Sequence, residues 1–273
     1  MTVQVDRSEV EAAIAVAARL GPFFEVDLKS RQRGNPVPSA GPVAPPWIPL
    51  RELASEPAHA RDRVRRAKTL MMSRLDLPES ALPDRVIASI VFLGLSARLF
   101  APSYGCLLLT GVSPSLTIDD VSWQAVDGGA MPLLVSSSSG IRDDRSAPQQ
   151  PSKTVRDHLL AHTISNLIEP ILTTFSREFR LSKIILWGNV ASGVSGAARA
   201  SMLIDPKPGP EDRRAAAALA AGLLETEPLA NAADVPDIDD ENWQPRRRSC
   251  CLFYRVPGAG TCGDCVLDGK RSR

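Results

Sequence analysis

The sequence has almost no net charge. Its 273 residues include 32 lysines and arginines and 31 aspartates and glutamates, which leaves a formal charge of +1. So balanced a composition creates no overall electrostatic field that would attract a polyanion. We therefore expect no nucleic-acid partner.

Long apolar runs are also missing. The longest uncharged stretch, residues 99–118, contains Pro102, Pro114 and several serines, and would make a poor transmembrane helix. The first twenty residues carry scattered charges instead of a basic segment followed by an apolar one, so they do not have the pattern of a secretory signal. We expect a soluble, cytoplasmic protein without a transmembrane segment.

Cysteine is scarce and unevenly placed. Four of the five cysteines lie within sixteen residues near the C-terminus, namely Cys250, Cys251, Cys262 and Cys265. The fifth, Cys106, stands in an apolar run and is expected to be a small buried side chain. In a reducing cytoplasm, clustered cysteines more often bind metal or perform redox chemistry than form structural disulfides.

The spacing of apolar residues predicts a mainly helical body. Residues 8–20 are expected to form a helix with Ser8 as its N-cap. Residues 82–109 predict one or two buried helices with a break near Pro102. Further helices are expected over 57–74, over 153–176 with a kink or split at Pro170, over 181–203 as a bent helix or helix pair, and over 210–225.

Other segments predict turns and loops. Asp127-Gly128-Gly129 separates two short apolar runs and indicates an antiparallel hairpin. Residues 30–49 contain six prolines and are expected to form a loop or tether, and the polar residues 136–151 a second loop. The predicted class is α+β, with a predominantly helical body and a small antiparallel hairpin element.

Charge changes sign abruptly near the C-terminus. Residues 237–241 are acidic, whereas residues 246–273 carry seven basic and two acidic side chains. Such a change is typical of a boundary between two units. We expect a body over residues 1–236 and a cysteine-containing domain over residues 237–273.

The four clustered cysteines have the spacing C-C-x10-C-x2-C. The C-x-x-C half is common to zinc, iron–sulfur and dithiol redox sites. Neighbouring side chains of a strand point to opposite faces, so Cys250 and Cys251 can serve one site only if the backbone is kinked there. Structural zinc sites favour spaced pairs at both ends, whereas a [2Fe-2S] cluster takes two thiolates on each iron. The cluster is therefore favoured, with a zinc knuckle, a dithiol oxidoreductase and a pair of disulfides as alternatives.

The residues between the cysteines suit a cluster-binding loop. Residues 257–260, PGAG, predict a turn that returns the chain to the site. Gly258, Gly260 and Gly263 would let backbone N–H groups approach sulfur.

The stretch RRSCCLFYRVPGAGTCGDC resembles the C-terminal signature of the siderophore-interacting ferric reductases, the ferric hydroxamate reductase family, which carries a C-terminal [2Fe-2S] cluster. Residues 186–193, LWGNVASG, are similar to a helical segment of the same family. The resemblance implies that Cys250, Cys251, Cys262 and Cys265 ligate the iron of a [2Fe-2S] cluster.

The same resemblance implies an oxidoreductase of iron uptake that transfers one electron from the cluster to siderophore-bound Fe(III) and releases Fe(II) in the cytoplasm. The substrate would be a ferric siderophore. The sequence has no convincing flavin or nicotinamide fingerprint, so we expect a separate electron donor, a ferredoxin or a flavin reductase. The alternative is a non-enzymatic iron–sulfur or zinc module that senses redox state or docks a partner.

Other residues are weaker candidates. The arginines Arg246, Arg247, Arg248 and Arg255 would offset the negative charge of a cluster and dock a partner or substrate, unless they form only a solvated tail. His158 and His162 have the i, i+4 spacing of helical metal ligands, with packing as the alternative. Asn189 is a candidate hydrogen-bonding group for the chelate, or else a helix-packing residue.

Overall fold

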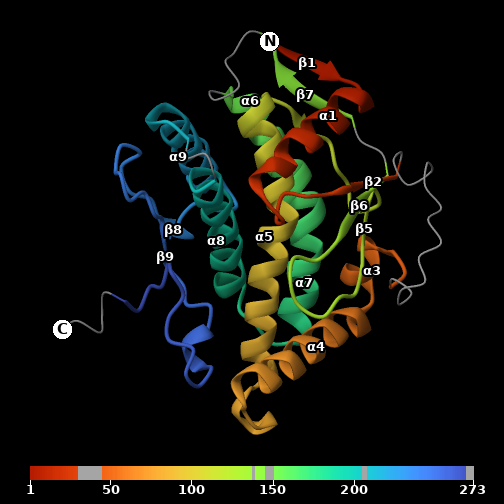
Figure 1. Cartoon of the computed structure of the whole chain (residues 1–273), viewed down its shortest axis with the longest axis vertical. Coiled ribbons are helices and arrows are strands. Elements are labelled where there is room, and N and C mark those ends of the chain that lie inside the picture. The colour runs from red at the N-terminus through yellow and green to blue at the C-terminus, as the bar shows by residue number, and fades with distance from the viewer. Residues whose placement is uncertain (30–44, 137–138, 145–150, 205–207, 269–273) are drawn as a thin grey trace.

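Helix α5 (Asp84–Thr110) is the axis of the fold, as Figure 1 shows. Most of its side chains are buried, because α1 (Arg7–Ala17), α4 (Pro57–Leu75) and α8 (Lys183–Met202) pack around it. Helix α8 approaches it closely at Gly193, where a Cβ atom would lie 3.0 Å from the backbone of Ala97. A glycine at this position lets the two helices pack backbone to backbone.

A computed structural model describes residues 1–29, 45–136, 139–144, 151–204 and 208–268. The remaining helical elements of these residues are α3 (Leu50–Ser55), α6 (Lys153–Leu159), the π-helix η3 (Leu160–Ile168), α7 (Glu169–Glu178), α9 (Pro210–Leu224) and the 3₁₀ turns η1 (Ala18–Leu20), η2 (Glu79–Ala81) and η4 (Phe253–Arg255).

The strands of the described residues form three small sheets. The first has the order β1-β7-β4 and is antiparallel, with strands Thr2–Val5, Gly140–Asp143 and Ser113–Pro114. The second has the order β2-β6-β5-β3, with a parallel β2–β6 pair and strands Asp27–Leu28, Leu133–Val135, Val121–Trp123 and Ile48–Pro49. The third is the antiparallel pair β8-β9, Ala233–Asp234 and Arg246–Arg247.

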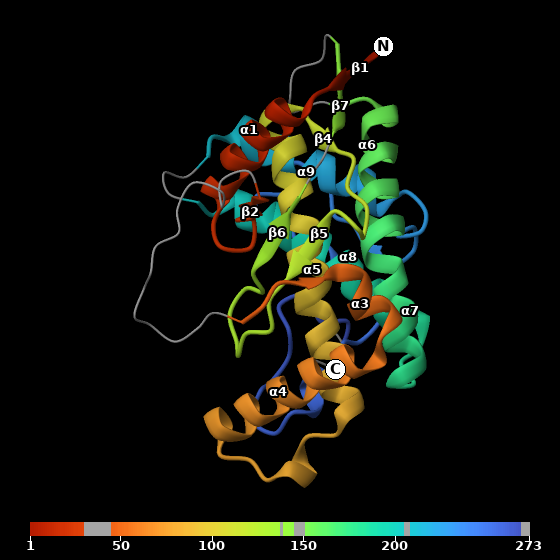
Figure 2. The ribbon, with the colours of Figure 1, turned by 90° about the vertical axis from the view of Figure 1, so that its right-hand side faces the viewer.

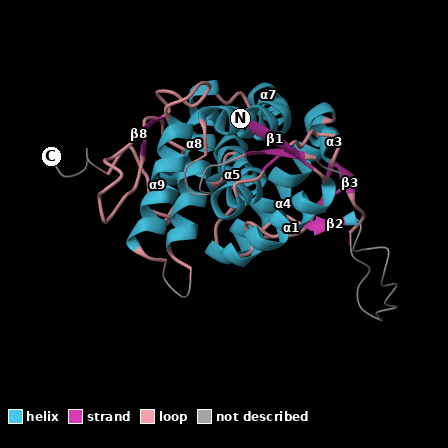
Figure 3. Ribbon diagram, turned by 90° about the horizontal axis from the view of Figure 1, so that it is seen from above, coloured by secondary structure: helices cyan, strands magenta, loops and turns pink. Residues whose placement is uncertain are grey.

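The four-stranded sheet and the C-terminal segment lie on opposite sides of α5. In Figure 2 the strands β6 and β5 face the viewer in front of α5. Seen from above in Figure 3, β8 lies beside α8 and α9, away from β2 and β3. The helical core thus separates the sheet from the cysteine-containing segment, which contacts α8.

The α+β class with a predominantly helical body is confirmed. The predicted hairpin is present as β5 and β6, with Val121 opposite Val135, and Gly128 and Gly129 in its connection both have positive φ. Helices predicted over 57–74 and 210–225 correspond to α4 and α9.

Several sequence predictions need correction. Helix α5 is continuous through Pro102, because packing along its whole length outweighs the single hydrogen bond that the proline removes. The N-cap of α1 is Asp6, whose carboxylate accepts from the Glu9 amide at 3.0 Å, and Ser8 donates its hydroxyl to Asp6 instead. The helix predicted over 153–176 is not split at Pro170 but runs continuously through α6, η3 and α7, with π-helical geometry from Leu160 to Ile168.

The two predicted loops lie mainly outside the described residues, over 30–44, 137–138 and 145–150. Within the second of them, however, Gly140–Asp143 form strand β7, which pairs with β1. Of the described helices, only α5 has the length and apolar composition of a membrane span. Of its most apolar stretch of 18 residues, 72% is buried inside the fold. This is the environment of a core helix.

Candidate metal centre

The cysteine-containing segment rests on the first turns of α8. Gly188 faces Ser249 so closely that a Cβ atom at position 188 would overlap the Ser249 hydroxyl. That hydroxyl donates a hydrogen bond of 3.0 Å to the carbonyl of Ile184. The helix predicted from LWGNVASG therefore forms the platform on which the segment docks.

The adjacent cysteines are followed by a sharp kink. Leu252 has φ 69° and ψ 1°, a left-handed conformation that non-glycine residues seldom adopt. Its amide donates to the Cys250 sulfur at 3.3 Å. The chain therefore turns sharply directly after the two neighbouring cysteines. Gly258 and Gly260, with φ 78° and 77°, then turn the chain back toward them.

The C-x-x-C pair is held by a similar turn. The Cys265 amide donates to the Cys262 carbonyl at 3.1 Å, and the Leu267 amide donates to the Cys265 sulfur at 3.3 Å. Amide-to-sulfur hydrogen bonds stabilise thiolates and are a feature of iron–sulfur sites. Both pairs therefore present sulfur atoms that are already hydrogen-bonded by the backbone.

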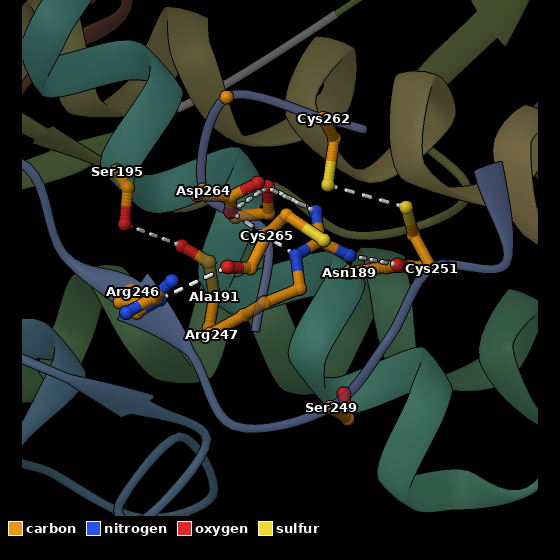
Figure 4. Close-up of polar contacts among 12 residues, drawn as sticks. Asn189, Ala191, Ser195, Arg246, Arg247, Ser249, Cys251, Cys262, Asp264 and Cys265 are labelled. Carbon is orange, nitrogen blue, oxygen red and sulfur yellow. Dashed lines mark hydrogen bonds and ion pairs between the residues drawn. The ribbon is translucent and has the colours of Figure 1, made fainter. Parts of the chain in front are cut away.

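The turns bring the cysteines together. The Sγ atoms of Cys251 and Cys262 lie 3.5 Å apart, and Figure 4 shows them pointing toward each other. Cys250 in turn interacts electrostatically with Cys251 and Cys265. All four are free, with Cys251 and Cys265 buried and Cys250 and Cys262 half-buried. One edge of the cluster of thiols therefore faces solvent.

The thiols differ in acidity. The pKa of Cys251 is lowered, first by the hydrogen bond between its sulfur and that of Cys262 and further by the charge of Arg247. The same hydrogen bond raises the pKa of Cys262, and burial raises that of Cys250. Cys106, by contrast, is fully buried away from the site, and burial raises its pKa to about 12. It is the inert buried residue that the sequence predicted.

Arg247 lies beneath the thiols and is 1% exposed. Its Nε and Nη2 atoms donate to the two carboxylate oxygens of Asp264 at 3.1 and 3.2 Å. Nη1 donates to Asn189 Oδ1 at 2.8 Å, and Nη2 also donates to Ser192 Oγ at 2.6 Å. Burial alone would lower the pKa of Arg247, but Asp264, Cys251 and Cys262 raise it, so the guanidinium stays charged.

Sequence reasoning missed Asp264 and Ser192, whereas the structure fits the helix-packing alternative for Asn189. The Ser192 hydroxyl donates to Asp264 at 2.5 Å, which closes the network around Arg247. Asn189 is fully buried and bonds to Arg247, so its amide is not presented to a chelate from solvent. An aspartate inside the C-x-x-C, close to a run of arginines, is the one sequence signal that pointed to an ion pair here.

The other arginines behave differently from Arg247. Arg246 and Arg255 are exposed, although Arg246 Nε also donates to the Cys265 carbonyl at 2.9 Å. Arg248 forms an exposed ion pair with Asp234 at 2.6 Å. A docking role is therefore open to these three side chains but not to Arg247.

The ring nitrogens of the two histidines already have hydrogen-bonding partners within the protein. His158 contacts Ser113 Oγ through Nδ1 at 2.8 Å and Ser115 Oγ through Nε2 at 3.0 Å, so both ring nitrogens are engaged. His162 stacks on it with 4.2 Å between ring centroids and contacts the Leu116 carbonyl. These contacts fit the packing alternative for His158 and His162.

The cysteine-containing segment matches a known family model. Residues 247–267 match the model described as the FhuF 2Fe-2S C-terminal domain, and no curated protein matches the chain. The residues present fit such a group: four free cysteines, with the sulfurs of Cys251 and Cys262 3.5 Å apart and those of Cys250 and Cys265 accepting amide hydrogen bonds. Residues 247–267 are therefore similar to a [2Fe-2S] domain of the FhuF type.

Proposed function

We propose that this protein is a ferric-siderophore reductase and that Cys250, Cys251, Cys262 and Cys265 hold its [2Fe-2S] cluster. The observation that carries the proposal is that four free cysteines on two separate turns lie within the segment that matches the cluster domain, with the sulfurs of Cys251 and Cys262 3.5 Å apart across the two turns. We propose ferric-siderophore reduction because proteins with a domain of the FhuF type are associated with that reaction.

The chemistry asks little of the protein beyond position and charge. Siderophore oxygens are hard ligands and bind Fe(III) far more tightly than Fe(II), so gaining one electron makes the iron labile. A bound [2Fe-2S] cluster supplies that electron, one at a time and at a potential that the protein sets. Iron is then released as Fe(II), and the electron is replaced by a separate donor, which we propose is a ferredoxin or a flavin reductase.

The chain's own residues favour this exchange at one face. Cys250 and Cys262 are half-buried and mark the edge that a chelate can approach, whereas Cys251 and Cys265 face the protein. Arg246 and Arg255 are exposed near the same segment and offer positive charge to an anionic chelate or an acidic donor. We place the reaction in the cytoplasm and treat residues 237–273 as the cluster-binding domain.

A single-turnover experiment tests the function. The protein, loaded with iron and sulfide, is reduced with dithionite, desalted without oxygen, and mixed with a ferric trihydroxamate or a ferric tricatecholate beside a coloured Fe(II) chelator. We expect the visible absorption of the oxidised cluster to return with one Fe(II) formed per cluster. Retention of the reduced spectrum with both chelates, in a protein that dioxygen reoxidises, would favour the non-enzymatic module.

A further inference from the structure

Asn189, Ser192 and Asp264 each turn an acceptor oxygen toward the guanidinium of Arg247. Asn189 uses its Nδ2 to donate to the Ser89 carbonyl and hydroxyl at 2.9 and 3.1 Å, so the amide turns its oxygen toward Arg247. Ser192 gives its proton to Asp264 and thereby offers a lone pair. This arrangement suits a planar cation with several fixed donors, and a lysine has fewer donors in a different geometry.

The network joins three distant parts of the chain. Ser89 belongs to α5, Asn189 and Ser192 to α8, and Asp264 to the C-x-x-C turn. Arg247 bonds directly to side chains of α8 and of the C-x-x-C turn, as Figure 4 shows. It is linked to Ser89 of α5 through Asn189. Its position therefore fixes the C-x-x-C turn relative to the helical core.

The Arg247 guanidinium lies beside the thiols. Figure 4 shows the Arg247 side chain next to Cys262 and Cys265, and it bonds Asp264, the residue between them in the C-x-x-C turn, at 3.1 and 3.2 Å. Since the pair is largely buried, with side chains 1% and 14% exposed, solvent and salt screen its charges poorly. A buried cation therefore lies beside the group that the four cysteines would hold.

We propose that Arg247 is a positioning residue that makes the bound group easier to reduce. The proposal rests on the proposed cluster site. One-electron reduction adds a negative charge to the group that the four cysteines hold, and a buried cation beside it stabilises the reduced form more than the oxidised form. The neighbouring exposed arginines contribute less, because water and ions screen them.

The test compares Arg247→Gln with Arg248→Gln in the loaded protein. The two substitutions remove the same charge one residue apart, one buried and one exposed. The readout is the midpoint potential, from a redox titration followed by visible absorption. We expect Arg247→Gln to lower the equilibrium constant for reduction at least tenfold, about 59 mV for one electron. Arg248→Gln should change it much less. Equal shifts in both variants would overturn the proposal.

Two further variants keep the proposal testable if Arg247→Gln loses the cluster. Asp264→Asn removes the counter-charge but keeps the side-chain shape, and should shift the potential upward. Arg247→Lys keeps the charge and should stay within threefold of the wild-type reduction constant. A downward shift in Asp264→Asn, or a tenfold loss in Arg247→Lys, would overturn the electrostatic role.

Melting temperatures of the metal-free variants distinguish a structural role of Arg247 from an effect on the midpoint potential. Arg247→Gln should melt below Arg248→Gln, because it leaves Asp264 and Asn189 buried without their donor. A lower melting temperature with an unchanged potential would mean that Arg247 is structural only. Because no siderophore is used, these results stand even if the protein proves not to reduce ferric siderophores.

Discussion

Gly188 and Ser249 are in contact with no space between them for a Cβ atom. Alanine at position 188 would force the Ser249 hydroxyl away from the Ile184 carbonyl and press on Ser249 Cβ at 3.3 Å. We expect Gly188→Ala to cost about 1–3 kcal/mol of stability, as overpacking does. Chemical denaturation of the metal-free protein measures it.

Gly196 on the same helix provides the matched control. Nothing lies within 4 Å of a Cβ at that position, so Gly196→Ala should stabilise the helix by about 0.5–1 kcal/mol. Ser249→Ala in the Gly188→Ala background should recover part of the loss, because the overlapping hydroxyl is then gone. Additive effects of the two substitutions would contradict the direct contact.

The cysteine assignment predicts a sharp contrast between two buried thiols. Cys251→Ala should lose the visible absorption and most of the iron and sulfide, since Cys251 contacts Cys262 in the site. Cys106→Ala should keep both, because Cys106 is buried within α5 away from the other cysteines. Full iron and sulfide in the Cys251→Ala protein would point to a site of three cysteines.

His158 should make stability depend on pH. Burial, and then the neighbouring His162, lower the pKa of His158 to about 4 from an ordinary value of 6.5. The unfolded chain therefore binds a proton more readily than the folded one, so this contribution is complete above pH 6.5 and is lost as pH falls toward 4. Between pH 7 and 4.5, His158→Gln should lose less melting temperature than wild type. Parallel pH profiles would rule this contribution out.

The proposed domain boundary predicts the behaviour of a truncated chain. Ending the protein after Glu225 removes β8 and β9 together and so leaves neither strand of that sheet unpaired. We expect a colourless protein with a helical circular dichroism spectrum and a reduced melting temperature, because buried side chains such as Leu229 and Trp243 are lost from the core. An unfolded product would make the cluster-binding segment part of one indivisible core.

The cysteines were accessible to sequence reasoning because four closely spaced thiols have few chemical uses. The turn at Leu252, directly after the adjacent cysteines, was not predicted, because leucine seldom adopts a positive φ. Arg247 could not be distinguished from Arg246 and Arg248 from the sequence. What distinguishes it is Asn189 and Ser192, more than fifty residues away, and only the folded chain brings them together.

In the fold, too, some elements can be predicted from local sequence and others depend on tertiary packing. Long helices such as α4 and α9 follow from alanine-rich composition, and α9 also from the proline and acidic residues at its start. Strands of two residues, such as β8 and β9, are too short for any period to appear and exist because tertiary packing aligns them. The continuity of α5 at Pro102 likewise depends on neighbours that come from elsewhere in the sequence.

The docking platform on α8 does not tolerate insertion or deletion of residues within it. Gly188, Asn189 and Ser192 meet Ser249 and Arg247 from within a stretch of five residues. Each residue of an α-helix is rotated by about 100° from the one before it. Inserting or deleting a single residue between Asn189 and Ser192 would therefore turn one partner away from the segment while the other stayed in place. This helix tolerates exchange of its outward side chains, such as Ile184, far better than any change in its register.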